Sequence, residues 1–499
     1  MESQQISGGE VANIVGGREV PVDGAERLDV LDPASGELLA RVPLSGADEV
    51  DAAVRAAAEA FPAWADEPLP KRARRMFALQ QIFEREIDDL ARIVVRENGK
   101  HLDEARGEIR RGIEVIELAA SMTTLMKGES LEQVADGVDV VMNRYPLGVV
   151  TAITPFNFPA MIPLWFLPLA IAAGNTVVLK PSQRTPLSAQ RIAELFAEAD
   201  FPPGVLNVVH GAQATVEALI DHDEVRAVSF VGSAPVAKAV YERSALRGKR
   251  VQALAGAKNH LVVMPDADLE SAVPAVFASA FSNAGQRCLA GSVAVGVGEV
   301  GESLVEELAQ MARSADLAAG DADGSDADST VTPVTTEEAR ERITRHIEAG
   351  EKEGARLVVD GRGADGEGFF VGPTLFDQVT PEMTLAREEI FGPVLAHESV
   401  ESLDDAIAAI NASQFGNAAA IFTRDGGAAR KFCREVKCGM IGVNVSVPAP
   451  VAYFPFAGWR GSFFGDLHAT GRDGVEFFTE RKVVTTRWPR ELNQHQRGR

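Results

Sequence analysis

Cysteine is scarce in this sequence, with only Cys288, Cys433 and Cys438 among 499 residues. Three thiols cannot form a disulfide framework, and their spacing matches no metal-ligand pattern, which indicates a reducing, cytoplasmic compartment. Lysine is also scarce: 11 of the 49 basic residues are lysine, against 72 acidic residues and a net charge of −23. A surface this acidic repels nucleic acid and anionic membranes, so we expect neither as a partner.

An uninterrupted membrane-length apolar run is missing as well. The most apolar stretch, residues 161–179, is broken by Pro163, Pro168 and the Gly174-Asn175 pair, whereas a membrane span needs about 20 apolar residues. It therefore predicts a buried helix followed by a buried strand. The N-terminal MESQQISGGE has no basic start and no apolar core, so we do not expect it to be a signal peptide.

The length predicts two or three domains with ample buried interior. Residues 149–264 alternate between short apolar runs and helical stretches, which is typical of a parallel, doubly wound sheet. In such sheets, ligands bind at the carboxyl ends of the strands. The strands are expected at 149–153, 176–179, 206–209, 228–231 and 261–264.

Other segments show a helical period or turn composition. Apolar residues at steps of three and four predict helix over 71–99 and over 188–199, the second with Thr185 as N-cap and Pro186 as first helical residue. After Cys288 we expect a surface loop at 320–330, a charged helix at 335–353 and a turn at 387–394. Two strand-like pieces, 137–146 and 481–488, are predicted to pair with each other or with a partner subunit.

Cys288 lies in SNAGQRCLAG, and two interpretations of it stay open at this level. A free cysteine is commonly a small buried hydrophobe. A nucleophilic thiol needs an electropositive, partly open setting, which Arg287 and the small neighbours supply. No histidine motif accompanies the cysteine, so a catalytic role predicts attack on a carbonyl such as an aldehyde rather than proteolysis.

Four further segments carry polar groups at expected strand ends or turns. Asn157 in TPFNFP is either an oxyanion donor or a turn residue. Lys180 in LKPS is either a phosphate or ribose ligand or a surface lysine. Gly232 in FVGS precedes a helix whose N–H groups suit a pyrophosphate, but one glycine is weak support. In EEIFGP, Glu389 and Phe391 suit a ribose and a nicotinamide ring, or a turn with a packed aromatic.

Taken in order, TPFNFP, NTVVLKPS, FVGS, GQRC and EEIFGP resemble the aldehyde dehydrogenase superfamily. The resemblance implies an α/β fold with a Rossmann-type cofactor domain, an α/β catalytic domain and a small β oligomerisation extension. The implied divisions are cofactor domain at 1–126 and 147–253, catalytic domain at 254–445, and oligomerisation segments at 127–146 and 446–499. It also implies a homotetramer or homodimer.

The same resemblance implies residue roles. Cys288 is the expected nucleophile, and Asn157 and the Cys288 backbone N–H are the expected oxyanion donors. Lys180 is expected at the adenosine ribose, Gly232 and Ser233 at the pyrophosphate, and Glu389 and Phe391 at the nicotinamide ribose and ring. The full set of expected cofactor-binding residues is Thr154, Pro155, Phe156, Lys180, Ser182, Gln183, Gly232, Ser233, Glu389 and Phe391.

Departures from the family pattern narrow the expected chemistry. Hydrolytic members carry a glutamate where Leu254 stands in LAGAKNH, and leucine cannot deprotonate water. GAKNH, the arginine in QRC and the segment 442–466 resemble the CoA-acylating methylmalonate-semialdehyde dehydrogenases, which also act on malonate semialdehyde. In that branch two arginines hold the substrate carboxylate, and Arg287 and Arg111 match them.

The resemblance implies NAD as cofactor and coenzyme A as co-substrate. Gln183 replaces the glutamate that usually follows KPS, so a 2′-phosphate meets less repulsion and NADP stays open. Three alternatives also stay open: a hydrolytic NAD(P)-dependent semialdehyde dehydrogenase that releases a free acid, an acylating enzyme for an uncharged aldehyde, and a catalytically silent binding or structural protein on the same fold.

Overall fold

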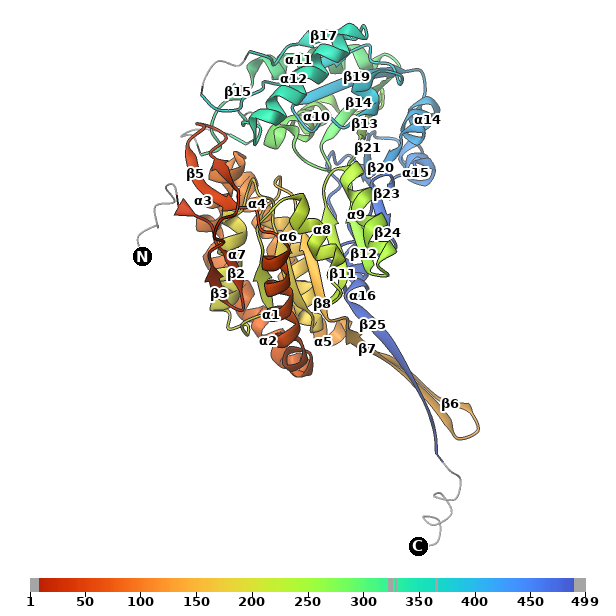
Figure 1. Ribbon diagram of the computed structural model, residues 1–499. Helices are drawn as coiled ribbons and strands as arrows, with labels where there is room; N and C mark the ends of the chain where they lie inside the picture. The colour runs from red at the N-terminus through yellow and green to blue at the C-terminus, as the bar shows by residue number, and fades with distance from the viewer. Residues whose placement is uncertain (1–8, 322–325, 328–329, 364–366, 489–499) are drawn as a thin grey trace.

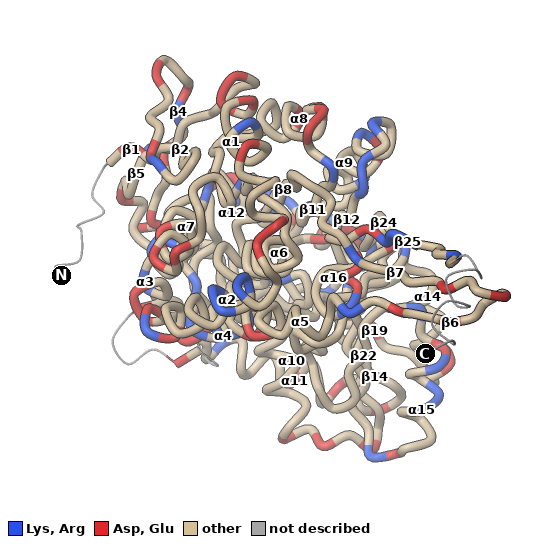
Figure 2. The backbone as a smooth tube through the Cα atoms, turned by 90° about the horizontal axis from the view of Figure 1, so that it is seen from below, with Lys and Arg blue, Asp and Glu red and all other residues tan. Residues whose placement is uncertain are grey.

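The chain forms two α/β lobes, from which a ribbon of strands projects (Figure 1). The structure is a computed structural model that describes residues 9–321, 326–327, 330–363 and 367–488. Each lobe is built on one large sheet, and helices cover both faces of it. Asp and Glu are spread over the outer helices and loops and are mixed with Lys and Arg (Figure 2).

The first lobe contains an eight-stranded sheet whose five central strands run parallel. Four of the predicted strands are confirmed in it, from 149–153 to 228–231. In sheet order the strands are β24 (Phe463–Gly465), β12 (Arg250–Leu254), β11 (Val225–Val231), β8 (Val149–Ile153), β9 (Thr176–Lys180), β10 (Leu206–Val208), β2 (Asn13–Val15) and β3 (Arg18–Val20).

The fifth predicted strand, 261–264, does not belong to that sheet. It is β13 (Asn259–Val263), which lies in the second lobe, while the unpredicted strand β12 takes the place beside β11. The chain crosses between the lobes within residues 255–258. Alternation of strands and helices indicates a parallel sheet, but it does not show where one sheet ends and the next begins.

Helices of the first lobe include the region predicted as one helix over 71–99, which is in fact two. The break falls at Glu86, where φ is −98° and ψ is 7°. The apolar face continues across the break, so periodicity alone hid it. The helices are α1 (Ala47–Asp66), α2 (Leu69–Arg85), α3 (Ile87–Asn98), α4 (Leu102–Ala120), α5 (Met122–Leu125), α6 (Met161–Ala173), α7 (Leu187–Glu198), α8 (Gln213–Asp221), α9 (Ala234–Leu246) and α16 (Gly471–Phe477).

The long apolar stretch is a buried helix and a buried strand, as predicted. Every residue of α6 is buried, and the helix ends at Gly174, whose φ of 107° is the left-handed conformation that favours glycine. The buried strand β9 follows two residues later. Within the described part of the chain, no helix is both long and apolar enough to cross a membrane.

The start of α7 differs from the prediction by one position. Pro186 is the N-cap and Leu187 the first helical residue. The hydroxyl of Thr185 caps nothing, because the buried carboxylate of Glu97 accepts the N–H groups of Leu187 at 2.7 Å and Ser188 at 3.0 Å. A cap supplied from another helix cannot be read from local sequence.

The second lobe contains a seven-stranded sheet that is parallel except at β17. Its strands, in sheet order, are β17 (Arg356–Val359), β18 (Thr374–Asp377), β19 (Val394–Val400), β14 (Gly291–Val297), β13, β21 (Ala418–Phe422) and β22 (Met440–Val443). Its helices are α10 (Leu269–Phe281), the 3-10 turn η1 (Ser282–Gly285), α11 (Val300–Ser314), α12 (Glu337–Lys352), α13 (Thr384–Arg387), α14 (Leu403–Ala412) and α15 (Gly426–Glu435).

Two predictions in this lobe have separate outcomes. The charged helix predicted over 335–353 is confirmed as α12. The loop predicted over 320–330 lies partly outside the described residues, at 322–325 and 328–329. Its last residue, Thr330, is buried in a short strand, β16 (Thr330–Val331), which pairs with β15 (Asp316–Leu317).

The two strand-like pieces near 137–146 and 481–488 pair with each other, one of the two outcomes predicted. Strand β7 (Val138–Pro146) lies between β6 (Glu129–Ala135) and β25 (Thr479–Arg487) in an antiparallel sheet. This sheet is the ribbon that leaves the body of the molecule in Figure 1. Two smaller sheets complete the fold: β1 (Gly9–Glu10), β5 (Leu38–Pro43) and β4 (Arg27–Leu31), and β20 (Phe415–Gly416) with β23 (Trp459–Arg460).

Candidate active site

A left-handed turn delivers Cys288 to the junction between the lobes. After α10, the backbone of Asn283, Ala284 and Gly285 has φ of 49°, 50° and 69°, a conformation that side chains other than glycine seldom adopt. A Cβ at Gly285 would lie 2.2 Å from the carbonyl oxygen of Gly392, which explains why glycine is needed there. The chain then passes through Cys288 into β14.

Two asparagine amides hold the backbone of Cys288. The Nδ2 of Asn259 donates to the Cys288 carbonyl at 3.0 Å, and the Nδ2 of Asn417 donates to the same oxygen at 2.8 Å. Both donors come from the second sheet, at β13 and next to β21. The nucleophile candidate is therefore fixed to a rigid sheet edge rather than carried on a loose loop.

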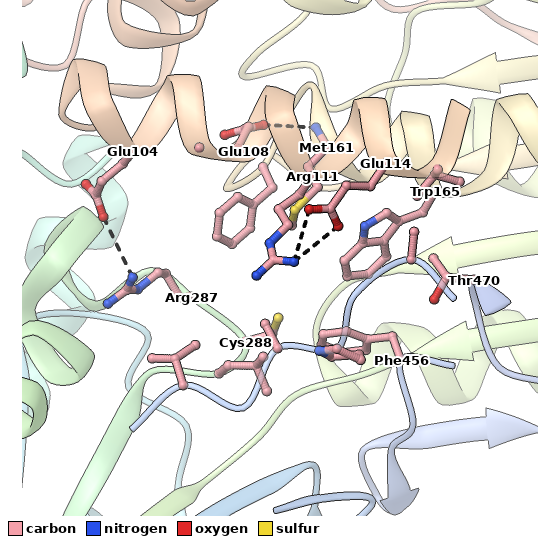
Figure 3. Close-up of a pocket in the computed structure, with 18 of the residues that line it drawn as sticks. Glu104, Glu108, Arg111, Glu114, Met161, Trp165, Arg287, Cys288, Phe456 and Thr470 are labelled. Atoms are coloured by element: carbon pink, nitrogen blue, oxygen red, sulfur yellow. Dashed lines mark hydrogen bonds and ion pairs between the residues drawn. The ribbon is translucent and has the colours of Figure 1, made fainter. Parts of the chain in front are cut away.

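The side chain of Cys288 lines a cavity of about 270 Å³ (Figure 3). Its walls come from α4, the start of α6, the turn before β14 and the C-terminal segment 447–470. Much of the wall is apolar, and the rings of Trp165 and Phe456 pack with their centroids 4.7 Å apart. A small, mostly apolar space with a few polar groups suits a short-chain substrate.

Both predicted arginines reach this cavity, and each has a carboxylate of α4 beside it (Figure 3). The Nη1 of Arg111 donates to Glu114 at 3.1 and 3.3 Å. The Nη1 of Arg287 lies 3.8 Å from Glu104, and its Nη2 donates to the carbonyls of Ala278 and Ser279 at the end of α10. The structure thus places both predicted arginines in the wall of the cavity that contains Cys288.

The thiol of Cys288 is protonated in this environment. Burial raises the pKa of the Cys288 thiol to about 12, and the negative charge of Glu389 adds to the rise. Arg287 and the N–H groups of Cys288 and Leu289 lower the pKa, but they do not outweigh burial. The sequence predicted that Arg287 favours the thiolate. Arg287 does lower the pKa of Cys288, but by less than burial raises it.

Asn157 lies next to the turn that carries Cys288. Its side-chain Nδ2 donates to the carbonyl of Gln286 at 2.9 Å, and the residue is buried. This hydrogen bond ties the carboxamide of Asn157 to the turn that carries Cys288. The structure therefore brings the predicted oxyanion donor and the predicted nucleophile into one unit.

The predicted cofactor residues between Thr154 and Ser233 lie at or just beyond one edge of the first sheet. Ile153 pairs in register with Lys180 and with Phe230, so β8, β9 and β11 end side by side. The N–H of Thr154 donates to the Lys180 carbonyl at 3.1 Å. Neighbouring carboxyl ends in a parallel sheet form the usual ligand site of this architecture.

Lys180 is buried at that edge without a carboxylate partner among the described residues. Its Nζ donates to Oε1 of Gln183 at 3.3 Å, and burial lowers the pKa of Lys180 to about 8. A buried cation of this kind suits an incoming hydroxyl or phosphate. The hydroxyl of Ser182 is used locally, since it accepts the N–H of Arg184 at 3.1 Å.

Gly232 and Ser233 stand at the N-terminus of α9. Ser233 is the exposed N-cap, with φ −64° and ψ 151°, and its side chain makes no cap hydrogen bond. A Cβ on Gly232 would lie 2.5 Å from the ring of Phe230. Glycine at position 232 therefore lets the backbone pass close to the Phe230 ring at the start of α9.

The 387–394 segment forms the opposite wall of this region. Phe391 has φ of 54°, and its ring meets that of Phe156 edge to face, 5.9 Å between centroids. Pro155 and Phe156 are half-buried. Glu389 accepts the N–H of Ala257 at 2.9 Å, and burial raises the pKa of its carboxyl to about 7. Phe391 thus packs against the segment that follows β8, and Glu389 is held at the connection between β12 and β13.

Leu254 occupies the position at which the family resemblance places the glutamate base of hydrolytic members. Leu254 is buried in the first-lobe core, and Cys288 packs against that same core. The carbonyl of Leu254 accepts the N–H of Gly232 at 3.2 Å. No carboxylate stands at this position to deprotonate a water beside an acyl group on Cys288.

Sequence reasoning missed four charged side chains of the cavity. Three of the four lie in α4, where their sequence pattern resembles that of solvated charges. Glu104 and Glu108 nevertheless recur with Arg111 at steps of four and three, which places the three side chains on one face of the helix. That spacing was the available signal. The missed residues are Lys100, Glu104, Glu108 and Glu114.

The structure is thus an α/β fold of two lobes, with a cavity at their junction that Cys288 lines. Residues 20–484 match the Aldehyde dehydrogenase family. The chain belongs to this family, and it is an oxidoreductase.

Named relatives cover nearly the whole chain. It is 55% identical over 479 residues to malonate-semialdehyde dehydrogenase 1 of Geobacillus kaustophilus, covering 95% of this chain and 97% of that protein. It is 51% identical over 484 residues to malonate-semialdehyde dehydrogenase of Halalkalibacterium halodurans, covering 97% and 99%.

Solved structures agree in fold. Methylmalonate-semialdehyde dehydrogenase from Oceanimonas doudoroffii superposes with a TM-score of 0.94 at 45% identity, covering 96% of this chain and 98% of that one. A putative methylmalonate-semialdehyde dehydrogenase from Sinorhizobium meliloti 1021, in complex with NAD, gives 0.94 at 42% identity with the same coverage.

Proposed function

We propose that this enzyme oxidises malonate semialdehyde or methylmalonate semialdehyde with NAD, decarboxylates the product and transfers the acyl group to coenzyme A. The products are acetyl-CoA and propionyl-CoA. The observation that carries the proposal is the cavity itself, in which Cys288 lies with two arginines. Relatives named for these substrates support it.

Substrate binding follows from charge and size. The substrate carboxylate binds between Arg111 and Arg287, where the guanidinium fork of each suits a carboxylate. The aldehyde carbon then lies toward Cys288, and the apolar wall of Trp165 and Phe456 excludes water from the reacting carbon.

The first chemical step forms a carbon–sulfur bond. The Cys288 thiol gives its proton to water, and its sulfur adds to the aldehyde carbon, which places negative charge on the carbonyl oxygen. Asn157 and the Cys288 N–H donate to that oxygen, and such donors contribute roughly 3–4 kcal/mol to transition-state stabilisation. Loss of hydride from the same carbon leaves a thioester on Cys288.

The second half of the reaction needs no activated water. The carboxylate is now β to a thioester carbonyl, so CO₂ leaves as its electron pair moves into the thioester enolate, which then takes a proton. The sulfur of coenzyme A attacks the carbonyl carbon, and the Cys288 sulfur leaves. With leucine at position 254, a thiol that ionises more readily than water is the expected acceptor.

NAD, when bound, supplies the hydride acceptor, and the residues at the sheet edge fit it. Lys180 and Gln183 would hold the adenosine ribose, with Thr154, Pro155 and Ser182 beside them. Gly232 and Ser233 would meet the pyrophosphate, and Phe156, Glu389 and Phe391 the nicotinamide side. Because Gln183 carries no charge, NADP is the alternative cofactor.

The proposed assembly is a homodimer or homotetramer. The three-stranded β6–β7–β25 sheet carries exposed apolar side chains, which a partner subunit would cover. They include Leu131, Val141, Val483 and Val484. The positions of β6, β7 and β25 support an oligomerisation segment at 127–146 and a bridging and oligomerisation segment at 446–499. The two large sheets support a cofactor domain at 1–126 and 147–253 and a catalytic domain at 254–445. Cysteine usage supports a cytoplasmic enzyme.

The proposal is tested by assaying malonate semialdehyde, methylmalonate semialdehyde and propanal, each with and without coenzyme A, and by identifying the product. We expect NADH formation that depends on coenzyme A and an acyl-CoA product lacking the substrate carboxylate. Free acid formed at the same rate without coenzyme A would instead support the hydrolytic alternative. Cys288→Ala is expected to form no NADH.

A further inference from the structure

A buried ion pair lies in the cavity wall and takes no part in the chemistry proposed above. Lys100, in the connection between α3 and α4, pairs with Glu108 of α4, and both side chains are fully buried. Both line the cavity that contains Cys288. Figure 3 draws the ion pair of Glu108 as a dashed line, separate from the interactions of Arg111 and Arg287.

Each partner of this pair also holds the backbone around Asn157. The Nζ of Lys100 donates to the Asn157 carbonyl at 2.7 Å. The other carboxylate oxygen of Glu108 accepts the N–H groups of Ala160 at 2.8 Å and Met161 at 3.0 Å, where α6 begins. The pair therefore binds the backbone at the predicted oxyanion donor and three to four residues after it.

Neighbouring groups reinforce the same segment. The ring of Phe158 lies 4.2 Å from the Lys100 Nζ, in the geometry of a cation–π contact. The Nδ2 of Asn98 donates to the Phe156 carbonyl at 3.0 Å. On the far side, Asn157 donates to Gln286, in the turn that carries Cys288.

A buried ion pair is a costly way to fill space, because both charges lose their hydration. An apolar pair of the same volume would pack as well, but the N–H groups of Ala160 and Met161 would lose their carboxylate acceptor. The Asn157 carbonyl would keep the longer hydrogen bond from the Asn283 Nδ2 at 3.4 Å. A carboxylate at the N-terminus of α6 also interacts favourably with the helix dipole. These contacts fix where the Asn157 backbone lies relative to the turn before Cys288.

We propose that Lys100 and Glu108 are positioning residues that hold Asn157 in the geometry needed to stabilise the oxyanion. The inference rests on the proposed function, since it assumes that Asn157 donates to the substrate oxygen. The pair acts through Asn157 and does not touch the reacting atoms. Its loss slows the oxidation step and leaves binding of substrate and cofactor unchanged.

The test uses the double variant Lys100→Met with Glu108→Gln. Neither charge is then left unpaired, and the glutamine oxygen still accepts the N–H groups of Ala160 and Met161, so the variant folds. NADH formation is measured in a single turnover with malonate semialdehyde. We expect the rate to fall at least about tenfold, with KM for the aldehyde and Kd for NAD changed less than about twofold.

The decisive comparison places the same double variant in an Asn157→Ala background. If the pair acts through Asn157, the two changes are not additive, and the rate falls less than about twofold further. An equal fall in both backgrounds, or no fall in the wild-type background, overturns the positioning role. A wild-type rate in Asn157→Ala alone, or NADH formation by Cys288→Ala, contradicts the proposed function instead.

A matched control removes a charge from another buried pair. Asp377, a buried carboxylate of the second lobe outside the cavity, accepts hydrogen bonds from His397 Nδ1 at 2.6 Å and from Arg356 Nε at 3.1 Å. Asp377→Asn is expected to lower the melting temperature and to leave the single-turnover rate within about twofold. A comparable rate loss in this control would show that general destabilisation explains the effect, and it would overturn the inference.

Discussion

The side-chain amide of Asn157 donates to the carbonyl of Gln286 at 2.9 Å, two positions before Cys288. Asn157 follows a strand of the first lobe, and Gln286 precedes a strand of the second. The hydrogen bond therefore ties the two lobes together at the point where the proposed oxyanion donor meets the proposed nucleophile. Substitutions at this junction and around it have five expected outcomes.

Removing the amide of Asn157 tests its role as oxyanion donor. Asn157→Ala should lower kcat about 10²–10³-fold, the effect of deleting one preorganised donor. KM for the semialdehyde should change little, because the donor acts on the charge that develops during addition. Steady-state NADH formation measures both constants, and a melting curve checks folding. A loss confined to KM would assign Asn157 to substrate binding.

Arg111 should decide between charged and uncharged aldehydes. Arg111→Gln removes one partner of the substrate carboxylate and should raise KM for malonate semialdehyde about 10–100-fold, as expected for a charge-assisted hydrogen bond. KM for propanal should stay within about twofold. The neighbouring Arg110 pairs with Glu84 and does not line the cavity, so Arg110→Gln is the matched control. Equal effects of the two variants would remove Arg111 from the carboxylate site.

A base at position 254 should change the product. Leu254→Glu places a carboxylate where hydrolytic relatives carry one, so malonate semialdehyde should give free acid without coenzyme A. Product analysis by mass spectrometry separates free acid from acyl-CoA. Leu254→Gln has a similar size without a basic carboxylate, and it should still require coenzyme A. Hydrolysis by the wild-type enzyme at the rate of the Leu254→Glu variant would contradict the argument.

The pH dependence of Cys288 reactivity follows from its raised pKa of about 12. Below that pKa the thiol stays protonated, so its thiolate fraction rises about tenfold for each pH unit. The rate of iodoacetamide labelling, followed by peptide mass spectrometry, should rise accordingly from about pH 7 to 9 without levelling off. Glu389→Gln removes a negative charge that raises this pKa, so labelling should be faster at each pH. A plateau in this range would mean a thiolate at rest.

Gln183 should permit use of NADP. The Lys180 cation lies 3.3 Å from the neutral Gln183 oxygen, and a carboxylate there would repel a 2′-phosphate. Gln183→Glu should raise KM for NADP at least about tenfold and leave KM for NAD within about threefold. Gln80→Glu, the same charge change on α2, is the control. An unchanged ratio of the two KM values would place the 2′-phosphate elsewhere.

Much of the fold was predictable because local patterns report local burial. Strands β8, β9 and β10 fall at the short apolar runs of the sequence, because every residue of these strands is buried in a parallel sheet. Helix α12 falls within the charged stretch 335–353. The break at Glu86, the Glu97 cap of α7 and the transfer of β13 to the second sheet were not predictable. Each depends on a contact between distant segments that leaves no local pattern.

The sequence by itself determined which chemistry was available. Cys288 among small neighbours, arginines at 111 and 287 and a leucine at 254 are matters of residue identity, and composition excluded disulfide and metal-ligand frameworks. Only the tertiary structure decided how these groups act. It raised the pKa of the thiol by burial, joined Asn157 to the nucleophile turn, and placed the Lys100–Glu108 pair beside them. Burial and distance between remote segments arise from packing, so they are set by the folded chain and not by any local pattern.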